Sequence, residues 1–262
     1  MRIQIASDLH LDKRPGHMPD PLEEFCPVFD RDLLILAGDV GAGMTARAFI
    51  ERETMISPVV YVPGNREYHT RVPHEEVDYE WRCLAADLHN LYYLAGEFEV
   101  IDDLRIWGGP WYSDLFSRRD YGYLEWINEV VTDFRFALNK EELWSIEQHV
   151  RLHEAQSDEI RSYAGFLEVV VTHWPPVIDA MPLRQRGASL AGYYVNDHEI
   201  LVREVGAQLW VSGNVWGPYD LMVDRTRCIA NPAEYPVEMP EADGFEPDRV
   251  VTAQPGVIVM DL

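Results

Sequence analysis

The stretch RIQIASDLH, residues 2–10, decides the fold class, because an apolar run ends abruptly in the polar residues Ser7, Asp8 and His10. Each apolar run of this kind is short, which is typical of a strand covered on both faces of a sheet. The same pattern of an apolar run followed by small and polar residues recurs in four further segments: LLILAGD (33–39), VVYVPGNRE (59–67), EVVVTHWPP (168–176) and QLWVSGNVW (208–216).

Segments of helical length separate the predicted strands. In the segment 74–89, for example, apolar residues recur at three- and four-residue spacing, which indicates one buried helix face. Strands that alternate with helices favour an α/β architecture. The pattern predicts helices over Met44–Met55, His74–His89, Glu141–Tyr163 and Asn196–Val205, and further strands over Leu104–Gly108, Arg227–Ala230 and Val257–Met260.

The length of 262 residues favours a single domain over residues 1–262, because one core can serve a chain of this size. No linker divides the sequence. The stretch at about 111–142 is the least regular and the richest in aromatic residues, so we interpret it as an inserted lobe. The acidic, proline-rich stretch 232–254 is expected to run over the surface.

The net charge and the composition limit the kinds of molecule that the protein is expected to bind. The net charge of −23 repels a phosphate backbone, so extended nucleic-acid binding is not expected, whereas 47% hydrophobic residues exclude a disordered chain. No apolar run approaches the roughly 20 residues of a membrane span, and the first residues lack a secretory pattern. Cys26, Cys83 and Cys228 have no metal-like spacing; we predict buried thiols in a reducing compartment, hence a cytoplasmic protein.

Polar side chains stand at the carboxyl end of each of the five strands. In open α/β sheets these ends converge on one crevice, so the five segments can supply a single site. Carboxylate, imidazole and amide oxygen together are ligands for divalent metals. The sequence therefore predicts a metal site at one edge of the sheets.

The five segments also resemble the motifs of the calcineurin-like metallophosphoesterases. The similarity rests on SDLH, GD, PGNRE, THWPP and SGNVW, which occur in the family's order between residues 7 and 216, and the segment TRCIANPAEYP resembles a common bacterial branch. The resemblance implies a two-sheet β-sandwich flanked by helices. It also implies a phosphodiesterase or phosphatase that acts on a small phosphoester through a metal-bound hydroxide.

The resemblance assigns a role to each matching residue. Asp8 and His10 would bind a first metal, Asn65 and His173 a second, and Asp39 would bridge the two. The divalent ions to be considered are Mn, Mg, Fe and Zn.

Three residues depart from the family pattern within this site. Asn214 and Trp216 stand where the family has metal-binding histidines. Asn214 can still coordinate a metal through its amide oxygen, but the indole ring of Trp216 has no lone pair for coordination. One ion is therefore predicted to bind better than two, with Mn or Mg favoured. Arg66 replaces a histidine and cannot act as a general acid, although it can contact a phosphate; His69 is the candidate replacement acid.

These departures leave more than one function open. The leading hypothesis is a phosphoester hydrolase of reduced activity. The alternatives are an impaired relative that binds a phosphate-bearing ligand or a protein partner, and a structural protein without metal, which the packed carboxylates argue against. Three further histidines are interpreted as structural, His149 and His153 on a solvated helix face and His198 in a helix cap.

Overall fold

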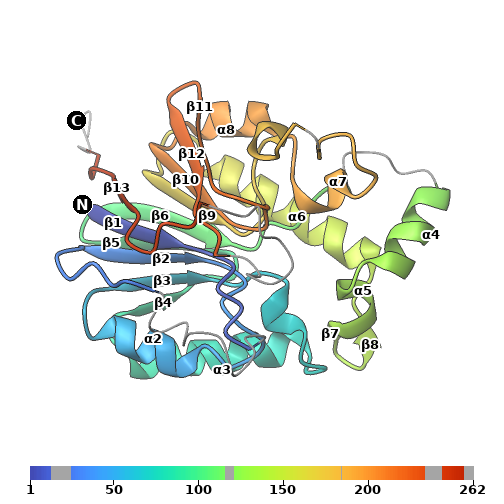
Figure 1. The fold of residues 1–262 in the computed structure, drawn as a ribbon, viewed down its shortest axis with the longest axis horizontal. Coiled ribbons are helices and arrows are strands. Elements are labelled where there is room, and N and C mark those ends of the chain that lie inside the picture. Colours follow the sequence, from blue (N-terminus) through green and yellow to red (C-terminus); the bar gives the residue numbers. More distant parts are fainter. Residues whose placement is uncertain (13–24, 116–120, 184, 234–243, 257–262) are drawn as a thin grey trace.

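Two β-sheets stack face to face, with helices on their outer faces (Figure 1). The structure is a computed structural model that describes residues 1–12, 25–115, 121–183, 185–233 and 244–256. This architecture confirms the predicted α/β sandwich. Within the described residues, no helix is both long and apolar enough to cross a bilayer.

The first sheet has five strands in the order β13-β1-β2-β3-β4. The four strands β1 to β4 run parallel, so that their carboxyl ends lie at the same edge, and β13 pairs antiparallel with β1. The strands are β1 (Arg2–Ala6), β2 (Leu33–Ala37), β3 (Val59–Val62), β4 (Leu91–Tyr93) and β13 (Val250–Thr252).

The second sheet has six strands in the order β11-β12-β10-β9-β6-β5. Its four central strands are parallel, and each outer strand is added through an antiparallel pairing. The strands are β5 (Glu97–Ile101), β6 (Leu104–Gly109), β9 (Val169–Thr172), β10 (Leu209–Ser212), β11 (Tyr219–Val223) and β12 (Thr226–Ala230).

Helices cover the outer face of each sheet and one end of the molecule. In Figure 1, α2 and α3 lie below the first sheet, α8 lies at the top beside β11 and β12, α6 runs to the right of β9, and α4, α5 and the β7-β8 hairpin lie at the right. Their bounds are α2 (Arg47–Thr54), α3 (His74–Asp87), α4 (Tyr121–Val130), α5 (Asp133–Phe136), β7 (Leu138–Asn139), β8 (Glu142–Leu143), α6 (Ile146–Ser162), α7 (Ala191–Tyr194) and α8 (Glu199–Val205).

The core follows from the alternation of side chains along the fully buried strands. In β2, Leu33 and Ile35 point into the cluster between the two sheets, whereas Leu34 and Leu36 belong to the cluster shared with α2 and α3. Trp210 of β10 packs on the other side, in the cluster shared with α6 and α8. The strands β2 and β3 therefore consist of unbroken apolar residues, because both of their faces are covered.

Several predictions from the sequence need correction. The short or edge strands β4, β5, β11 and β13 were missed because an edge strand needs little apolar sequence. The end of the surface stretch 232–254 supplies β13, and the predicted strand 257–260 lies outside the described residues. Cys228 is a buried thiol, but Cys26 and Cys83 are exposed, so the prediction of three buried thiols was wrong.

A buried ion pair fastens the first sheet to α2. Arg31, just before β2, lies 2.7 Å from Glu53 of α2, and both side chains are fully buried. The remaining donors of Arg31 bond Ser57 at 2.8 Å and the side chain of Gln4 in β1 at 2.6 Å. The network satisfies a charge that would be very costly to bury alone.

We predict that Glu53→Gln destabilises the protein far more than Glu51→Gln. Glu51 lies on the same helix but pairs with Arg47 near solvent, so its loss should cost less than about 0.5 kcal/mol. Neutralising Glu53 leaves Arg31 as an uncompensated buried charge and should cost about 3–5 kcal/mol. Urea unfolding of both variants measures the difference, and equal losses would show that the buried pair contributes nothing special.

Candidate metal centre

The predicted site residues follow the carboxyl ends of the parallel strands, where the chain turns sharply. Asp8 and Asp39 have positive φ angles of 54° and 53°, and Asn214 has 53°. Asp and Asn tolerate this left-handed conformation better than larger residues. The Asp8 amide donates to the Gly38 carbonyl at 2.9 Å, and the Asn214 amide donates to Asp8 Oδ2 at 3.2 Å. The turns after β1, β2 and β10 are thus bonded to one another.

These turns surround one cavity of about 400 Å³. The predicted residues on its wall are Asp8, His10, Asp39, Asn65, Arg66, His69 and Asn214. His173 is fully buried, with its Nε2 atom 3.3 Å from Asp39 Oδ1. Residues scattered over two hundred positions therefore meet around Asp39, as the motif order predicted.

Asp8, Asp39 and His173 form the compact part of the site, since one ligand atom from each lies within 4.8 Å of the others. His173 Nδ1 donates to the Ala37 carbonyl at 2.8 Å, and burial lowers the pKa of this histidine, so the neutral ring carries its lone pair on Nε2. That lone pair faces Asp39 without a hydrogen bond. A cation between the two acceptors removes the repulsion, so the residues fit a divalent metal.

Asn65 can add an oxygen ligand. Its Nδ2 donates to Asp133 Oδ1 at 2.9 Å, which fixes the orientation of the amide because a carboxylate only accepts. The buried Oδ1 atom of Asn65 has no hydrogen-bond partner among the described residues. A buried amide oxygen left unsatisfied on the wall of this cavity is consistent with a role as a metal ligand.

Burial also shapes the charge at Asp39. Desolvation raises the pKa of Asp39 to about 7, while the Arg66 backbone amide, which donates to Oδ1 at 2.7 Å, acts in the opposite direction. A nearby divalent cation favours the ionised form of such a carboxyl. The packing is tight as well, because a Cβ at Gly64 would lie 2.2 Å from Asp39 Oδ1.

The three residues that we expect to depart from the family pattern, Asn214, Trp216 and Arg66, make defined contacts. Asn214 Nδ2 donates to the Tyr194 carbonyl at 3.1 Å. The Trp216 ring packs 4.9 Å from the Tyr194 ring, centroid to centroid, and lines the cavity. Arg66 pairs with Asp12, with Nε 3.0 Å from Oδ2, and its Nη1 donates to His69 Nδ1 at 3.2 Å.

Asp133 is a site residue that the sequence analysis missed. It begins α5, lines the cavity and accepts hydrogen bonds from His69 Nε2 at 2.8 Å, from Asn65 and from the Tyr193 hydroxyl. Burial by itself raises the pKa of Asp133, but these hydrogen bonds outweigh it and hold the pKa below its ordinary value. No motif surrounds Asp133, so only the placement of the 111–142 stretch reveals it.

Glu67 is the second residue whose role was missed, although it stands in the PGNRE motif. Its fully buried carboxylate accepts from the backbone amides of Val40 and Gly64, both at 2.8 Å, and of Asp39 at 3.1 Å. The Tyr61 hydroxyl donates to it at 2.7 Å. Glu67 therefore holds the turns after β2 and β3 in a fixed relation.

The interpretation of His149 and His153 was wrong, whereas His198 stands in a helix cap as predicted. His149 and His153 lie on the inner side of α6, only 0% and 3% exposed, and not on a solvated face. His198 occupies the N-cap position of α8 but makes no side-chain cap bond; its Nε2 lies 3.4 Å from Asp114. Helical periodicity failed here because the second sheet and its loops cover the side of α6 that carries these histidines.

A family profile described as calcineurin-like phosphoesterase matches residues 1–214. The chain belongs to this family. No relative among curated proteins matches it significantly.

Two solved structures share the fold of this chain. The crystal structure of phosphopantetheinyl hydrolase (PptH) from Mycobacterium tuberculosis is similar with a TM-score of 0.71 and 19% identity, over 97% of this chain and 96% of that one. A second crystal structure has a TM-score of 0.54 and 12% identity over 88% of this chain and 90% of its own. At these identities the likeness concerns the fold.

We predict that Glu67→Gln destabilises the protein more than Tyr61→Phe. The amide of glutamine would turn a donor toward backbone N–H groups that need an acceptor, at a cost of about 2–4 kcal/mol, whereas Tyr61→Phe removes one donor and should cost about 1 kcal/mol. Denaturant unfolding measures both. Similar losses for the two variants would mean that the backbone amides do not depend on this carboxylate.

Proposed function

We propose that the protein is a metal-dependent phosphoester hydrolase that acts on small phosphoesters, with one high-affinity metal position. The observation that carries this proposal is the buried His173 Nε2 atom, which faces Asp39 without a hydrogen bond, with Asp8 beside them at the end of the sheets. A divalent cation held there supplies a Lewis acid that polarises a phosphoryl oxygen. Asp8, Asp39 and His173 would hold the ion, and Asn65 would add an amide oxygen.

The departures support one ion rather than two. Trp216 offers no ligand atom, and the side chain of Asn214 already donates to a backbone carbonyl. An oxygen-rich set with a single imidazole suits Mn²⁺ or Mg²⁺ better than a softer ion. Mn²⁺ and Mg²⁺ are therefore the ions we propose.

The surroundings of Arg66 and His69 support slow turnover. His69 Nε2 carries the proton that bonds Asp133, and its Nδ1 accepts from Arg66. Neither ring nitrogen directs a proton into the cavity, and arginine cannot release one at working pH. Arg66 can bind and orient a phosphoryl group, but neither Arg66 nor His69 is placed to protonate a poor leaving group.

The substrate class follows from the walls and from the neighbouring fold. The cavity is lined both by polar groups and by apolar ones, among them Val131 and Leu190. A small phosphoester with an apolar arm fits this mixed lining. Because the phosphopantetheinyl hydrolase shares the fold along 96% of its length, phosphopantetheine esters belong among the first compounds to test.

We also propose a cytoplasmic location, with which the three free cysteines are compatible.

We predict that bis(4-nitrophenyl) phosphate is hydrolysed with added Mn²⁺ or Mg²⁺, and that chelation abolishes the activity. Asp39→Asn should lower kcat/KM by at least about 10², because the carboxylate closest to His173 then loses its charge. Glu76→Gln, at an exposed position of α3, is the matched control and should be without effect. Full activity in chelated protein, or in Asp39→Asn, would overturn the proposal.

We further predict that the triple variant Arg66→His, Asn214→His, Trp216→His gains activity, most strongly on alkyl phosphoesters. Restoring a general acid is worth about 10²–10⁴ in rate. Kinetics with nitrophenyl and alkyl esters measure the gain. The alternative function, a module that only binds a phosphate-bearing ligand, is favoured if the wild-type protein binds inorganic phosphate in the presence of Mn²⁺ but hydrolyses neither ester.

A further inference from the structure

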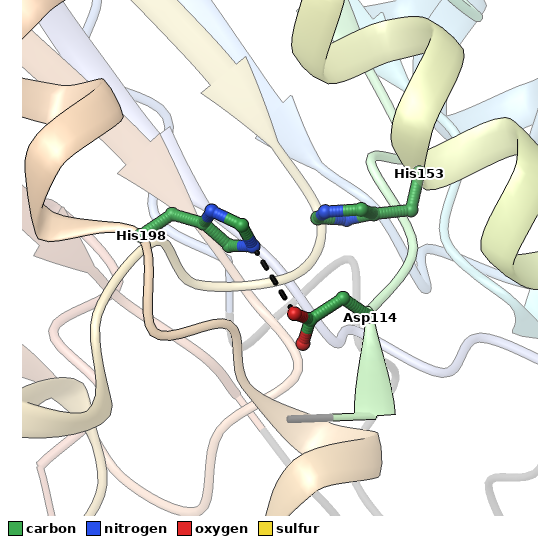
Figure 2. Close-up of side chains that lie close together, drawn as sticks. All are labelled: Asp114, His153 and His198. Atoms are coloured by element: carbon green, nitrogen blue, oxygen red, sulfur yellow. Dashed lines mark ion pairs between the residues drawn. The ribbon is translucent and has the colours of Figure 1, made fainter. Parts of the chain in front are cut away.

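A second group of metal-ligating side chains lies outside the cavity just described. One ligand atom from each of Asp114, His153 and His198 lies within 4.8 Å of the others, and none of the three residues lines the first cavity. Figure 2 shows the two imidazole rings and the carboxylate turned toward one another from three separate segments: the loop after β6, α6 and the start of α8. We propose that these residues bind a Zn²⁺-type ion.

The spacing of His198 and Asp114 matches that of two ligands on one ion. His198 Nε2 lies 3.4 Å from Asp114 Oδ2, yet this buried nitrogen makes no hydrogen bond within the described part of the chain. Two ligands of a tetrahedral zinc ion stand about 3.3 Å apart, since Zn–N and Zn–O bonds are each about 2.0–2.1 Å long. The same close approach without a hydrogen bond occurs between His173 and Asp39 in the first site.

His153 is oriented as a metal-binding histidine is. Its Nδ1 atom donates to the Tyr112 carbonyl at 2.6 Å, so the lone pair of the neutral ring stands on Nε2. The Ser157 hydroxyl lies 3.3 Å from this Nε2 atom, and a bound ion would take its place as the partner of the lone pair. The Trp111 ring stacks on the imidazole at 5.4 Å, centroid to centroid, and fixes its plane. The residue is 3% exposed, which excludes competing solvent from that side of the site.

The loop that carries Asp114 is held by the chain just before His198. The Asp114 amide donates to Asn196 Oδ1 at 3.1 Å, and the Asn196 side chain also donates to the carbonyls of Trp111 and Tyr112, at 3.4 Å each. The ligands from the loop and from α8 are therefore prepositioned before any ion arrives, which reduces the entropy lost on binding.

Charge and access suit a zinc-type ion. Two neutral imidazoles and one carboxylate give a net charge of about −1 and a donor set that zinc accepts. The side chains of Asp114 and His198 are 20% and 28% exposed, so an ion can enter and a water molecule can complete the coordination. Because the His198 amide bonds the Pro176 carbonyl at 2.9 Å, an ion here would also stiffen the loop that follows His173.

The test counts zinc on full-length protein after removal of all metal and dialysis against Zn²⁺. His198→Gln should bind about one zinc ion per chain fewer than the wild type. His89→Gln, at an exposed histidine, is the matched control and should bind as much as the wild type. The zinc counts with and without His198→Gln are repeated in a protein that also carries Asp39→Asn, so that zinc bound at the first site does not affect the difference.

Stability and spectra give independent readouts. Zn²⁺ should raise the melting temperature of the single variant Asp39→Asn but not that of the double variant Asp39→Asn, His198→Gln. Co²⁺ should give the absorption spectrum of a tetrahedral ion only in the variant that retains His198. Phosphoesterase activity lost with Asp39 but retained in His198→Gln would separate this site from the proposed catalytic one. Equal zinc counts with and without His198 would overturn the proposal and leave a metal-free histidine–aspartate contact.

Discussion

The carboxylate of Glu67 is the constraint on which the first site depends. It lies in a fully buried position and collects backbone amides from the turns after β2 and β3, so that Asp39 and the Gly64–Asn65 turn cannot move independently. Burial raises the pKa of Glu67, and the charge of Asp39 adds to that effect. The backbone N–H groups that point at Glu67 nevertheless require a hydrogen-bond acceptor there. A negative group is thus used to hold other negative groups in place.

The candidate site also depends on the stacking of the two sheets, because each sheet contributes residues to it. Asp8 and Asp39 follow strands of the first sheet, whereas His173 and Asn214 follow strands of the second. A site that takes side chains from both sheets exists only where their carboxyl edges meet. The core between the sheets, which includes Ile35 and Val171, therefore also holds this candidate site together, because a shift between the layers would separate its side chains.

The residues that we expect to differ from the family pattern make different kinds of contact. The Trp216 ring packs against the Tyr194 ring, and Arg66 pairs with the carboxylate of Asp12. Asp8, Asp39 and His173 lie close enough together to hold a cation. The proposed function rests on this group, and the proposed slow turnover rests on the surroundings of Arg66 and His69.

The sequence by itself determined the strands β1, β2 and β3 to the residue, the α/β class and the convergence of Asp8, Asp39 and His173, because buried parallel strands leave a strong apolar signal and their polar ends share one edge. Tertiary structure alone decided the partners of single side chains. Asp133 entered the site, and His153 joined Asp114 and His198, through contacts between segments far apart in the chain, and local periodicity carries no information about such contacts.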